Sequence, residues 1–311
     1  MDLGYHIHAQ SGTAGSERAA RIQRALAARR DRVDQAGTEV QTALESVADD
    51  LAEALREFLT AKAGGTETAR IKAAAQATKL DDILEVLRQV GAGTGEAGTL
   101  DAARQAWLDQ LGQLALDAET TLGAVGIDHA DRILDGEAAS AALAARYEDA
   151  ASTWDAHIVR PLADRVLQGL RSSARLESLD EAVTRIAANE GASIFNAVTE
   201  ARTRTAEFDR WVSAEAAELA DPDGTRLMWA YTGPDDGIER PFCDALNGKF
   251  FTRAELLVLN NQQFGHPIDT GGGYRCRHQW LQAVAKVLES IGYSRGGAGD
   301  IAAANAGAMR H

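Results

Sequence analysis

Hydrophobic residues recur every three, four or seven positions along most of the first 220 residues. The first such run begins after Ser16 and ends at Gly64-Gly65. Its apolar positions are Ile22, Leu26, Val33, Val40, Leu44, Val47, Leu51, Leu55 and Phe58. One apolar stripe between charged flanks is typical of an amphipathic helix, here about 60 Å long if unbroken at 1.5 Å per residue. Because its polar face is not basic, the stripe favours packing in a bundle or coiled coil over binding to a membrane surface.

The same periodicity predicts more helices before residue 221. They are expected over 66–90, from Thr99 to about 134, from 138 to beyond Pro161, and over about forty residues after Ser178. Proline lacks a backbone N–H and clashes inside a helix, so Pro161 predicts a kink or a new helix start. Ser178 and Glu181 have the spacing of a capping box at the start of the last of these helices.

The pattern changes after Asp221-Pro222-Asp223-Gly224, a run of strongly turn-forming residues. Alternation over 227–232 predicts a short strand. A short helix after Phe242, a turn at Asn247-Gly248 and a helix capped by Thr252 with Glu255 are expected next. After a loop over 260–273, residues 274–280 are expected to be extended, before a last helix to residue 287 or 288.

These patterns predict a mainly α fold, with an N-terminal long-helix bundle or elongated helical body and a small α+β C-terminal module. The expected parts are a flexible arm over 1–15, a helical domain over 16–220, the module over 226–290 and a flexible Gly/Ala-rich tail over 291–311. An aromatic content of only 5% also suits closely packed helices better than a bulky sandwich core.

The charge distribution limits the classes of partner. Residues 1–225 hold 38 of the 46 acidic residues and 23 of the 32 basic ones, so the helices carry most of the net charge of −14. An acidic surface repels phosphate backbones, which disfavours duplex-DNA binding by the whole chain.

No stretch approaches the about 20 apolar residues of a membrane span, and residues 1–15 do not resemble a signal peptide. We therefore expect synthesis in the cytoplasm and no membrane partner.

The residues with distinctive chemistry gather in 226–282, which holds both cysteines. Cys243, His266, Cys276 and His278 form a candidate ligand set for Zn²⁺, which accepts thiolate and imidazole donors. In an extended backbone Cys276 and His278 would face the same side, because side chains alternate with period two. A small module would gain stability from a structural ion. The spacing is not that of a standard zinc finger, so two buried free thiols, or a disulfide formed after release from the cytosol, remain alternatives.

A catalytic interpretation of the same residues is also open. If only three protein ligands bind, a fourth position could carry water and act as a Lewis-acid site. A hydrolase would then need a general base, for which Asp236, Glu239 and Asp244 are nearby carboxylates. Acidic residues beside turns are usually only solvated, so the sequence favours the absence of enzymatic activity.

A nucleic-acid interpretation rests on three arginines and two aromatic residues. Arg240, Arg275 and Arg277 could pair with phosphates, while Tyr274 and Trp280 could stack on bases. Salt bridges to the neighbouring acidic residues would explain the arginines equally well.

The order of residues in this segment resembles a known family. Trp229 is followed by Asp236, Arg240 and Cys243 as W…D…R-P-x-C, then by Leu246-x-Gly248-Lys249-x-Phe251, a proline-bearing loop and Cys276-Arg277-His278. This succession resembles the C-terminal domain of phage head-morphogenesis proteins, the Mu protein F-like minor head proteins of tailed bacteriophages. It covers about residues 195–282, and its motif positions include Trp229, Asp236, Arg240, Gly248 and Arg277.

The chain departs from the family pattern at two places. Many relatives carry histidine in place of Cys243 and Cys-Arg-Cys in place of Cys276-Arg277-His278, a swap that preserves ligand type. An Arg-Thr-Glu-like segment of the preceding helix has only a loose counterpart here, in Thr199-Glu200 with Arg202.

The resemblance implies a structural virion protein at the portal vertex or capsid interior, acting in head assembly, DNA packaging or delivery. It implies the portal protein or the major capsid protein as partner, and contact with packaged DNA through Arg275 and Arg277 is a further expectation. Similar modules also occur in toxin-like proteins, so a metal-dependent hydrolase or nuclease using the Cys/His cluster is the alternative.

Overall fold

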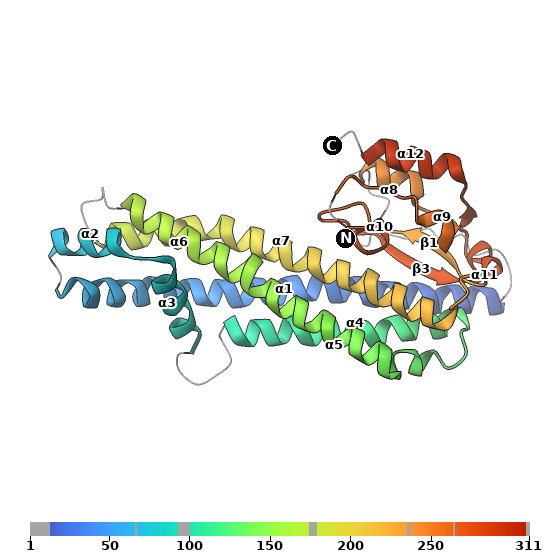
Figure 1. Cartoon of the computed structure of the whole chain (residues 1–311), viewed down its shortest axis with the longest axis horizontal. Helices are drawn as coiled ribbons and strands as arrows, with labels where there is room; N and C mark the ends of the chain where they lie inside the picture. The colour runs from blue at the N-terminus through green and yellow to red at the C-terminus, as the bar shows by residue number, and fades with distance from the viewer. Residues whose placement is uncertain are drawn as a thin grey trace. The chain divides into compact units, whose positions relative to one another are not determined.

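The computed structural model describes residues 13–65, 67–92, 100–173, 179–234, 237, 239–263 and 265–308 (Figure 1). Over these residues the protein is mainly helical, with long helices in its N-terminal part and a small four-stranded mixed sheet with helices in its C-terminal part. The predicted fold class is therefore confirmed. The predicted arm over 1–15 falls mostly outside the described residues, and so does Ser178 of the predicted capping box.

The long helices follow the apolar periodicity of the sequence. They are α1 (Thr13–Ala63), α4 (Leu100–Val125), α5 (Glu137–Trp154), α6 (Arg160–Ser173) and α7 (Leu179–Ala220), with the shorter α2 (Thr68–Ala77) and α3 (Leu80–Ala92) between α1 and α4. As predicted, α1 ends just before Gly64-Gly65. The irregularity predicted at Pro161 is also confirmed, because a π-helical segment over Asp155–Val159 precedes it and the proline lies in the first turn of α6.

The chain divides into two compact units, which are described separately. One unit combines Gln35–Asp109 with Glu148–Arg202. Its interior contains Trp107 and Trp154, whose ring centroids lie 5.6 Å apart. The other unit combines the described parts of Met1–Asp34, Gln110–Tyr147 and Thr203–His311, so helical segments that precede residue 221 belong to the same unit as the C-terminal module.

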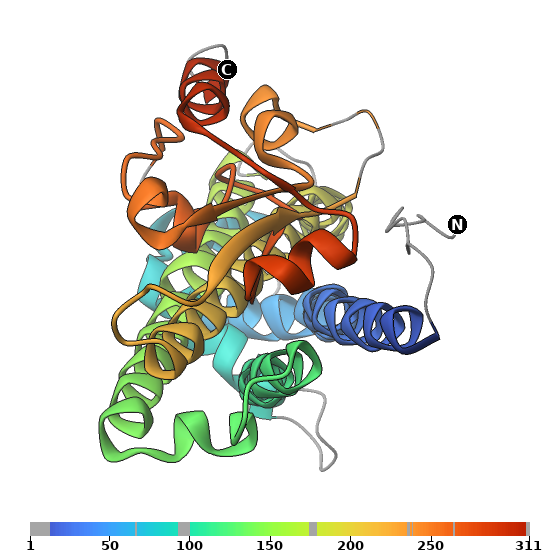
Figure 2. The same ribbon diagram turned by 90° about the vertical axis from the view of Figure 1, so that its right-hand side faces the viewer.

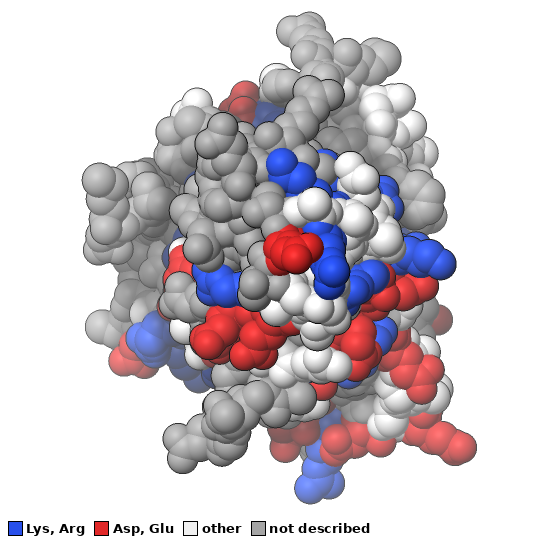
Figure 3. All heavy atoms as spheres, turned by 90° about the vertical axis from the view of Figure 1, so that its left-hand side faces the viewer, with Lys and Arg blue, Asp and Glu red and all other residues white. Residues whose placement is uncertain are grey.

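Charged side chains of both signs lie on the described surface (Figure 3). Ion pairs such as Arg88–Glu85, at 3.0 Å, link neighbouring turns of helices. Figure 3 shows one face on which acidic and basic side chains are interspersed. The described part of that face therefore lacks the continuous basic patch typical of a DNA-binding surface. None of the described helices has both the length and the apolar character needed to cross a membrane.

The sheet of the C-terminal module has the strand order β3-β1-β2-β4. Its strands are β1 (Met228–Thr232), β2 (Lys249–Thr252), β3 (Gln279–Ala283) and β4 (Ser294–Arg295). The central strand β1 pairs antiparallel with both β2 and β3, and β2 pairs parallel with β4. In this register Tyr231 lies opposite Trp280. The strand predicted from the alternation at 227–232 is thus confirmed.

Short helices connect the strands and cover the sheet (Figure 2). They are α8 (Pro241–Leu246), α9 (Arg253–Leu256), α10 (Pro267–Thr270), α11 (Ala285–Ser290) and α12 (Ala298–Ala308). The predicted capping box at α9 is confirmed, because Thr252 Oγ1 accepts from the Glu255 N–H and the Glu255 carboxylate accepts from the Thr252 N–H.

Two predictions for the end of the chain are wrong. Residues 274–280 are not extended throughout: Tyr274 and Arg275 form a turn, with Arg275 at a φ of 63°, and β3 begins only at Gln279. The stretch expected to be a flexible tail instead contains β4 and α12, and Ile301 is buried in the core. Small residues allow this packing, since a Cβ on Gly307 would approach the Pro241 backbone to 2.8 Å.

Asp221 joins the last long helix to the module. Its Oδ2 accepts hydrogen bonds from the backbone N–H groups of Arg226 and Leu227, each at 2.8 Å. Burial raises the pKa of the Asp221 carboxyl, but these two bonds and the Arg226 guanidinium outweigh it and hold the pKa below its ordinary value. The carboxylate of Asp221, the first residue of the turn predicted at 221–224, therefore holds the backbone that follows this turn.

Replacing Asp221 with alanine is expected to lower the free energy of unfolding by about 1–3 kcal/mol at neutral pH, because a buried N–H donor, that of Leu227, and a partly buried one, that of Arg226, lose their acceptor. A carboxyl with a depressed folded pKa stabilises above its unfolded pKa of about 3.9, and this contribution is lost as pH falls through the folded value. Urea denaturation at a series of pH values should show the wild type and Asp221→Ala converging in acid. A gap that stays constant with pH would contradict this account.

Candidate metal site

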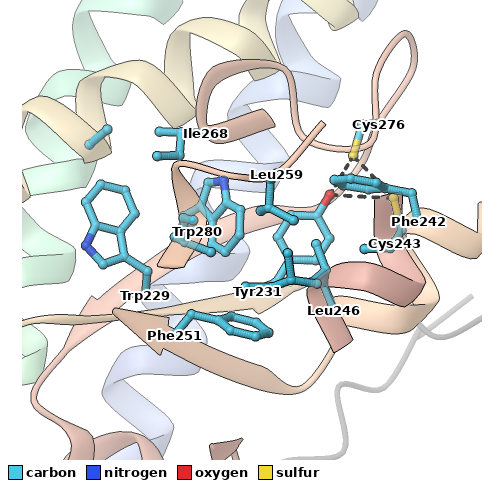
Figure 4. Packing of buried hydrophobic residues seen from close by; sticks show 14 of the residues in the cluster. Trp229, Tyr231, Phe242, Cys243, Leu246, Phe251, Leu259, Ile268, Cys276 and Trp280 are labelled. Atoms are coloured by element: carbon cyan, nitrogen blue, oxygen red, sulfur yellow. Dashed lines mark hydrogen bonds between the residues drawn. The ribbon is translucent and has the colours of Figure 1, made fainter. Parts of the chain in front are cut away.

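The apolar core of the module surrounds the sulfur atoms of both cysteines (Figure 4). The labelled side chains in that view are Trp229, Tyr231, Phe242, Cys243, Leu246, Phe251, Leu259, Ile268, Cys276 and Trp280. They come from β1, β2, β3, α8, α10 and the loops between them. The cysteines are therefore core residues of a folded module and do not lie on its surface.

Three of the four predicted ligands meet in this core. Cys243 comes from α8, Cys276 follows the turn after α10, and His278 lies directly before β3. All three are buried, and their ligand atoms lie within 4.8 Å of one another. The two sulfur atoms are 3.8 Å apart, and Cys276 Sγ is 3.9 Å from His278 Nδ1. This buried group could hold a metal ion.

The distance between the sulfur atoms distinguishes two chemical states of the cysteines. A disulfide requires about 2.05 Å between sulfurs, so at 3.8 Å both cysteines are free thiols. Two thiolate ligands at about 2.3 Å from a tetrahedral Zn²⁺ ion would lie about 3.8 Å apart. The spacing therefore suits a shared ion without movement of the backbone.

Glycine is needed where the loop passes the cysteines. A Cβ on Gly272 would come within 2.3 Å of Cys243 Sγ, so no other residue fits without displacing the sulfur. The backbone N–H of Gly272 also donates to Cys276 Sγ at 3.1 Å. The Gly271-Gly272-Gly273 run thus lets the main chain approach both sulfur atoms, which the sequence alone did not predict.

Two arginines hold the loop that carries Cys276 and His278. Arg210 of α7 is buried and donates to the carbonyl oxygens of Asp269 at 2.6 Å and His278 at 2.9 Å. Arg240 donates to the carbonyl oxygen of Gly272 at 3.1 Å and to that of Tyr274. Arg240, a motif residue of the resemblance, therefore positions the backbone beside the cysteines.

The pKa values of the two thiols are shifted in opposite directions. The hydrogen bond from Cys243 holds the pKa of the Cys276 thiol well below its ordinary value, against the effect of burial, and the hydrogen bond to His278 and the charge of Arg210 act in the same direction. The bond to Cys276 and burial raise the pKa of the Cys243 thiol. Cys276 is therefore the thiol of the pair that loses its proton more readily, and thiolate is the form that binds a metal.

His278 has an unusual environment for a buried histidine. Its Nε2 has no hydrogen-bond partner within the described part of the chain, although the residue is only 3% exposed. Its ring stacks on that of Tyr231, with centroids 5.0 Å apart and an interplanar angle of 4°. The nitrogen beside Cys276 Sγ is the other one, Nδ1, and it is the atom that could bind an ion held by the two sulfurs.

His266 does not join the group, which corrects its place in the predicted ligand set. Its Nδ1 accepts a hydrogen bond from the Ile268 N–H at 3.2 Å, and it caps α10. Its Nε2 lies 3.4 Å from the Leu257 carbonyl oxygen. The proline-bearing loop that was expected to deliver a ligand therefore supplies a helix cap.

The other predicted residues have varied positions. Trp229 is buried in the core, and Gly248 forms the turn between α8 and β2. Arg275 and Arg277 are exposed, and the Arg275 guanidinium lies 5.6 Å from the Tyr274 ring centroid. Asp236 lies outside the described residues.

The remaining predicted carboxylates and Trp280 lie at different depths in the module. Glu239 is half-buried in the segment before α8, and Asp244 is exposed on that helix. Trp280 is fully buried and donates to the Pro267 carbonyl oxygen at 3.3 Å, so its ring cannot stack on a base.

Sequence reasoning missed Tyr231 and Arg210, which contact the ligands or their backbone. Tyr231 was assigned only to a strand, although its hydroxyl lies 3.2 Å from Cys276 Sγ and 3.5 Å from Cys243 Sγ. Asp209 and Arg210 lie between Phe208 and Val212, which keep the four-residue spacing of the apolar stripe, so the spacing did not mark either residue as buried.

The sequence was compared with known protein families, with curated proteins and with solved structures, and no match was found in any of the three.

Proposed function

We propose that this chain is a structural minor head protein of a tailed phage or phage-like particle, and that its C-terminal module is a docking unit stabilised by Zn²⁺. Its place would be the portal vertex or capsid interior, after synthesis in the host cytoplasm. Its partners would be the portal protein and the major capsid protein. The main observation in support of this proposal is the burial of Cys243, Cys276 and His278 in the module core.

The positions of the motif residues support a structural role. Trp229, Cys243, Phe251 and Cys276 are each 5% exposed or less, so they shape the module from within. Residues that recognise a substrate would need an open surface. The proposed ion would accordingly join α8 to the segment before β3, two parts of the chain more than thirty residues apart.

Zn²⁺ is the ion that the donor set suits best. Two cysteine sulfurs and an imidazole nitrogen are typical ligands of structural zinc, whereas Mg²⁺ and Ca²⁺ prefer oxygen. A catalytic zinc site also has three protein ligands and a water molecule. That similarity keeps a metal-dependent hydrolase or nuclease as the second candidate.

Co-expression with the portal and major capsid proteins of the same genome tests the structural proposal. The chain is expected to co-purify with portal rings or assembled particles, and the purified protein is expected to leave DNA intact with Zn²⁺ or Mg²⁺ present. Metal-dependent cleavage that Cys276→Ser abolishes while the circular dichroism spectrum stays unchanged would instead establish the nuclease.

Contact with packaged DNA is assigned to Arg275 and Arg277. Each arginine that neutralises a phosphate contributes about one unit to the slope of log K against log salt concentration. Replacing both by alanine is expected to reduce that slope by about two and to weaken DNA binding without regard to sequence. DNA-binding assays from low to physiological salt concentration measure this slope. An unchanged slope in the double variant would show that Arg275 and Arg277 do not contact DNA. Arg295→Ala, which removes another exposed arginine of the module, is the control.

A further inference from the structure

The hydroxyl group of Tyr231 points at both sulfur atoms of the candidate site (Figure 4). Tyr231 lies in the central strand β1 and is fully buried. Its hydroxyl oxygen is 3.2 Å from Cys276 Sγ and 3.5 Å from Cys243 Sγ. Residue type pointed to cysteine and histidine ligands and not to this tyrosine.

The tyrosine ring is held on two sides. Its face stacks on the His278 ring, and its centroid lies 4.6 Å from that of Trp280 on the paired strand β3. A Cβ on Gly271 would come within 3.2 Å of the hydroxyl oxygen, so the main chain closes a third side. The position of the oxygen is thus set by the sheet and by the glycine loop.

Four of the six separations among these donors are close to those of a tetrahedral ligand set. A four-coordinate ion with sulfur at about 2.3 Å and nitrogen or oxygen at about 2.0 Å places its ligand atoms about 3.3–3.8 Å apart. The observed separations are 3.2 and 3.5 Å for oxygen to sulfur, 3.8 Å for sulfur to sulfur and 3.9 Å for sulfur to nitrogen. The hydroxyl oxygen therefore lies at a ligand-to-ligand distance from both sulfur atoms.

We propose that the Tyr231 oxygen is the fourth protein ligand of the ion held by Cys243, Cys276 and His278. This inference rests on the proposed metal binding of the module and goes beyond it, because four protein ligands leave no position for water. Such a site is closed and structural, whereas catalytic zinc keeps an open position. The candidate ion is thereby assigned to folding and not to hydrolysis.

Substitution of Co²⁺, whose visible spectrum reports its coordination, tests the proposal on the full chain. The wild type is expected to give a four-coordinate spectrum with thiolate charge-transfer bands that does not change when azide is added. Tyr231→Phe keeps the ring and removes the oxygen, so it should still bind Co²⁺ through the thiolates. Its fourth position would then be open, and azide should shift its spectrum.

The affinity of the variant gives a second readout. Tyr231→Phe should bind Co²⁺ more weakly by at least the about 10- to 100-fold that the loss of an outer-shell partner costs. Tyr293→Phe, which changes another buried tyrosine of the same module, should match the wild type in affinity and in its response to azide.

Each alternative result overturns a defined statement. A wild-type spectrum that azide shifts would show an open position and overturn the role of Tyr231 while leaving metal binding intact. The same applies if Tyr231→Phe binds Co²⁺ as tightly as the wild type. Failure of the folded wild type to bind Co²⁺ or Zn²⁺ overturns this inference together with the zinc part of the proposed function. If Tyr231→Phe does not fold, the azide test on the wild type alone decides.

Discussion

Asp209→Ala is expected to destabilise the unit that contains the module by about 3–5 kcal/mol, the usual cost of removing one partner of a buried ion pair. Asp209 of α7 accepts hydrogen bonds from Arg29 Nε at 2.7 Å and Arg29 Nη2 at 3.0 Å, and the two side chains are 1% exposed or less. Gln279 Nε2 of β3 also donates to this carboxylate at 3.2 Å. The substitution leaves the guanidinium of Arg29 buried without its counter-charge, and urea denaturation measures the loss.

A matched pair of variants separates burial from charge. Glu218→Ala removes the partner of an ion pair with Arg253 in the same unit, where the Glu218 side chain is 48% exposed. Exposed pairs contribute about 0–1 kcal/mol, so this variant should remain close to the wild type. The double variant Arg29→Met with Asp209→Leu should recover most of the stability, because it leaves no buried charge. If Asp209→Ala and Glu218→Ala lower the free energy of unfolding equally, burial does not determine the contribution of these ion pairs.

Removal of the proposed ion is expected to have an effect of similar size. A ligand that binds only the folded state at 1,000 times its Kd stabilises that state by about 4 kcal/mol. A zinc chelator should therefore lower the unfolding temperature of the wild type strongly. His278→Gln should unfold at the lower temperature with or without chelator, because it lacks a ligand.

His266→Gln provides the control for this prediction. The side chain caps α10 and lies outside the ligand group, so its loss should cost about 1 kcal/mol while leaving the response to chelator intact. A chelator response that disappears in His266→Gln, or persists in His278→Gln, would show that the ligand set is wrong.

Local sequence patterns predicted much of this fold. Apolar periodicity identified the long helices, and the turn residues at 221–224 identified the end of the last one, α7. The capping box of Thr252 and Glu255 was identified because its contacts lie within one turn of helix. Each of these features depends on residues close together in the chain, which is why composition and spacing were sufficient.

Features that depend on distant contacts were not predictable in this way. The Gly/Ala-rich composition of 291–311 suggested a tail, yet small residues let α12 pack closely against α8. His266 has the right chemistry for a ligand but is used as a helix cap. Tyr231 and Arg210 contact residues of the site that lie 12 and 68 positions away in the sequence, and such contacts cannot be predicted from local spacing.

The three ligands were predicted for a reason that was only partly correct. Cys276 and His278 were expected to face one side of an extended strand. They instead precede β3, in a segment shaped by a turn at Tyr274 and Arg275. Residue type identified Cys243, Cys276 and His278, whereas the glycine loop and the Arg210 and Arg240 hydrogen bonds bring them together. The role in a phage head stays a prediction from the resemblance.

Native mass spectrometry of the full chain purified without chelator tests the zinc site most directly. The account predicts one Zn²⁺ ion per wild-type chain, retained in His266→Gln and absent from Cys276→Ser and His278→Gln. A folded wild-type chain without metal after growth with added zinc, or an ion that stays bound in Cys276→Ser, would contradict it.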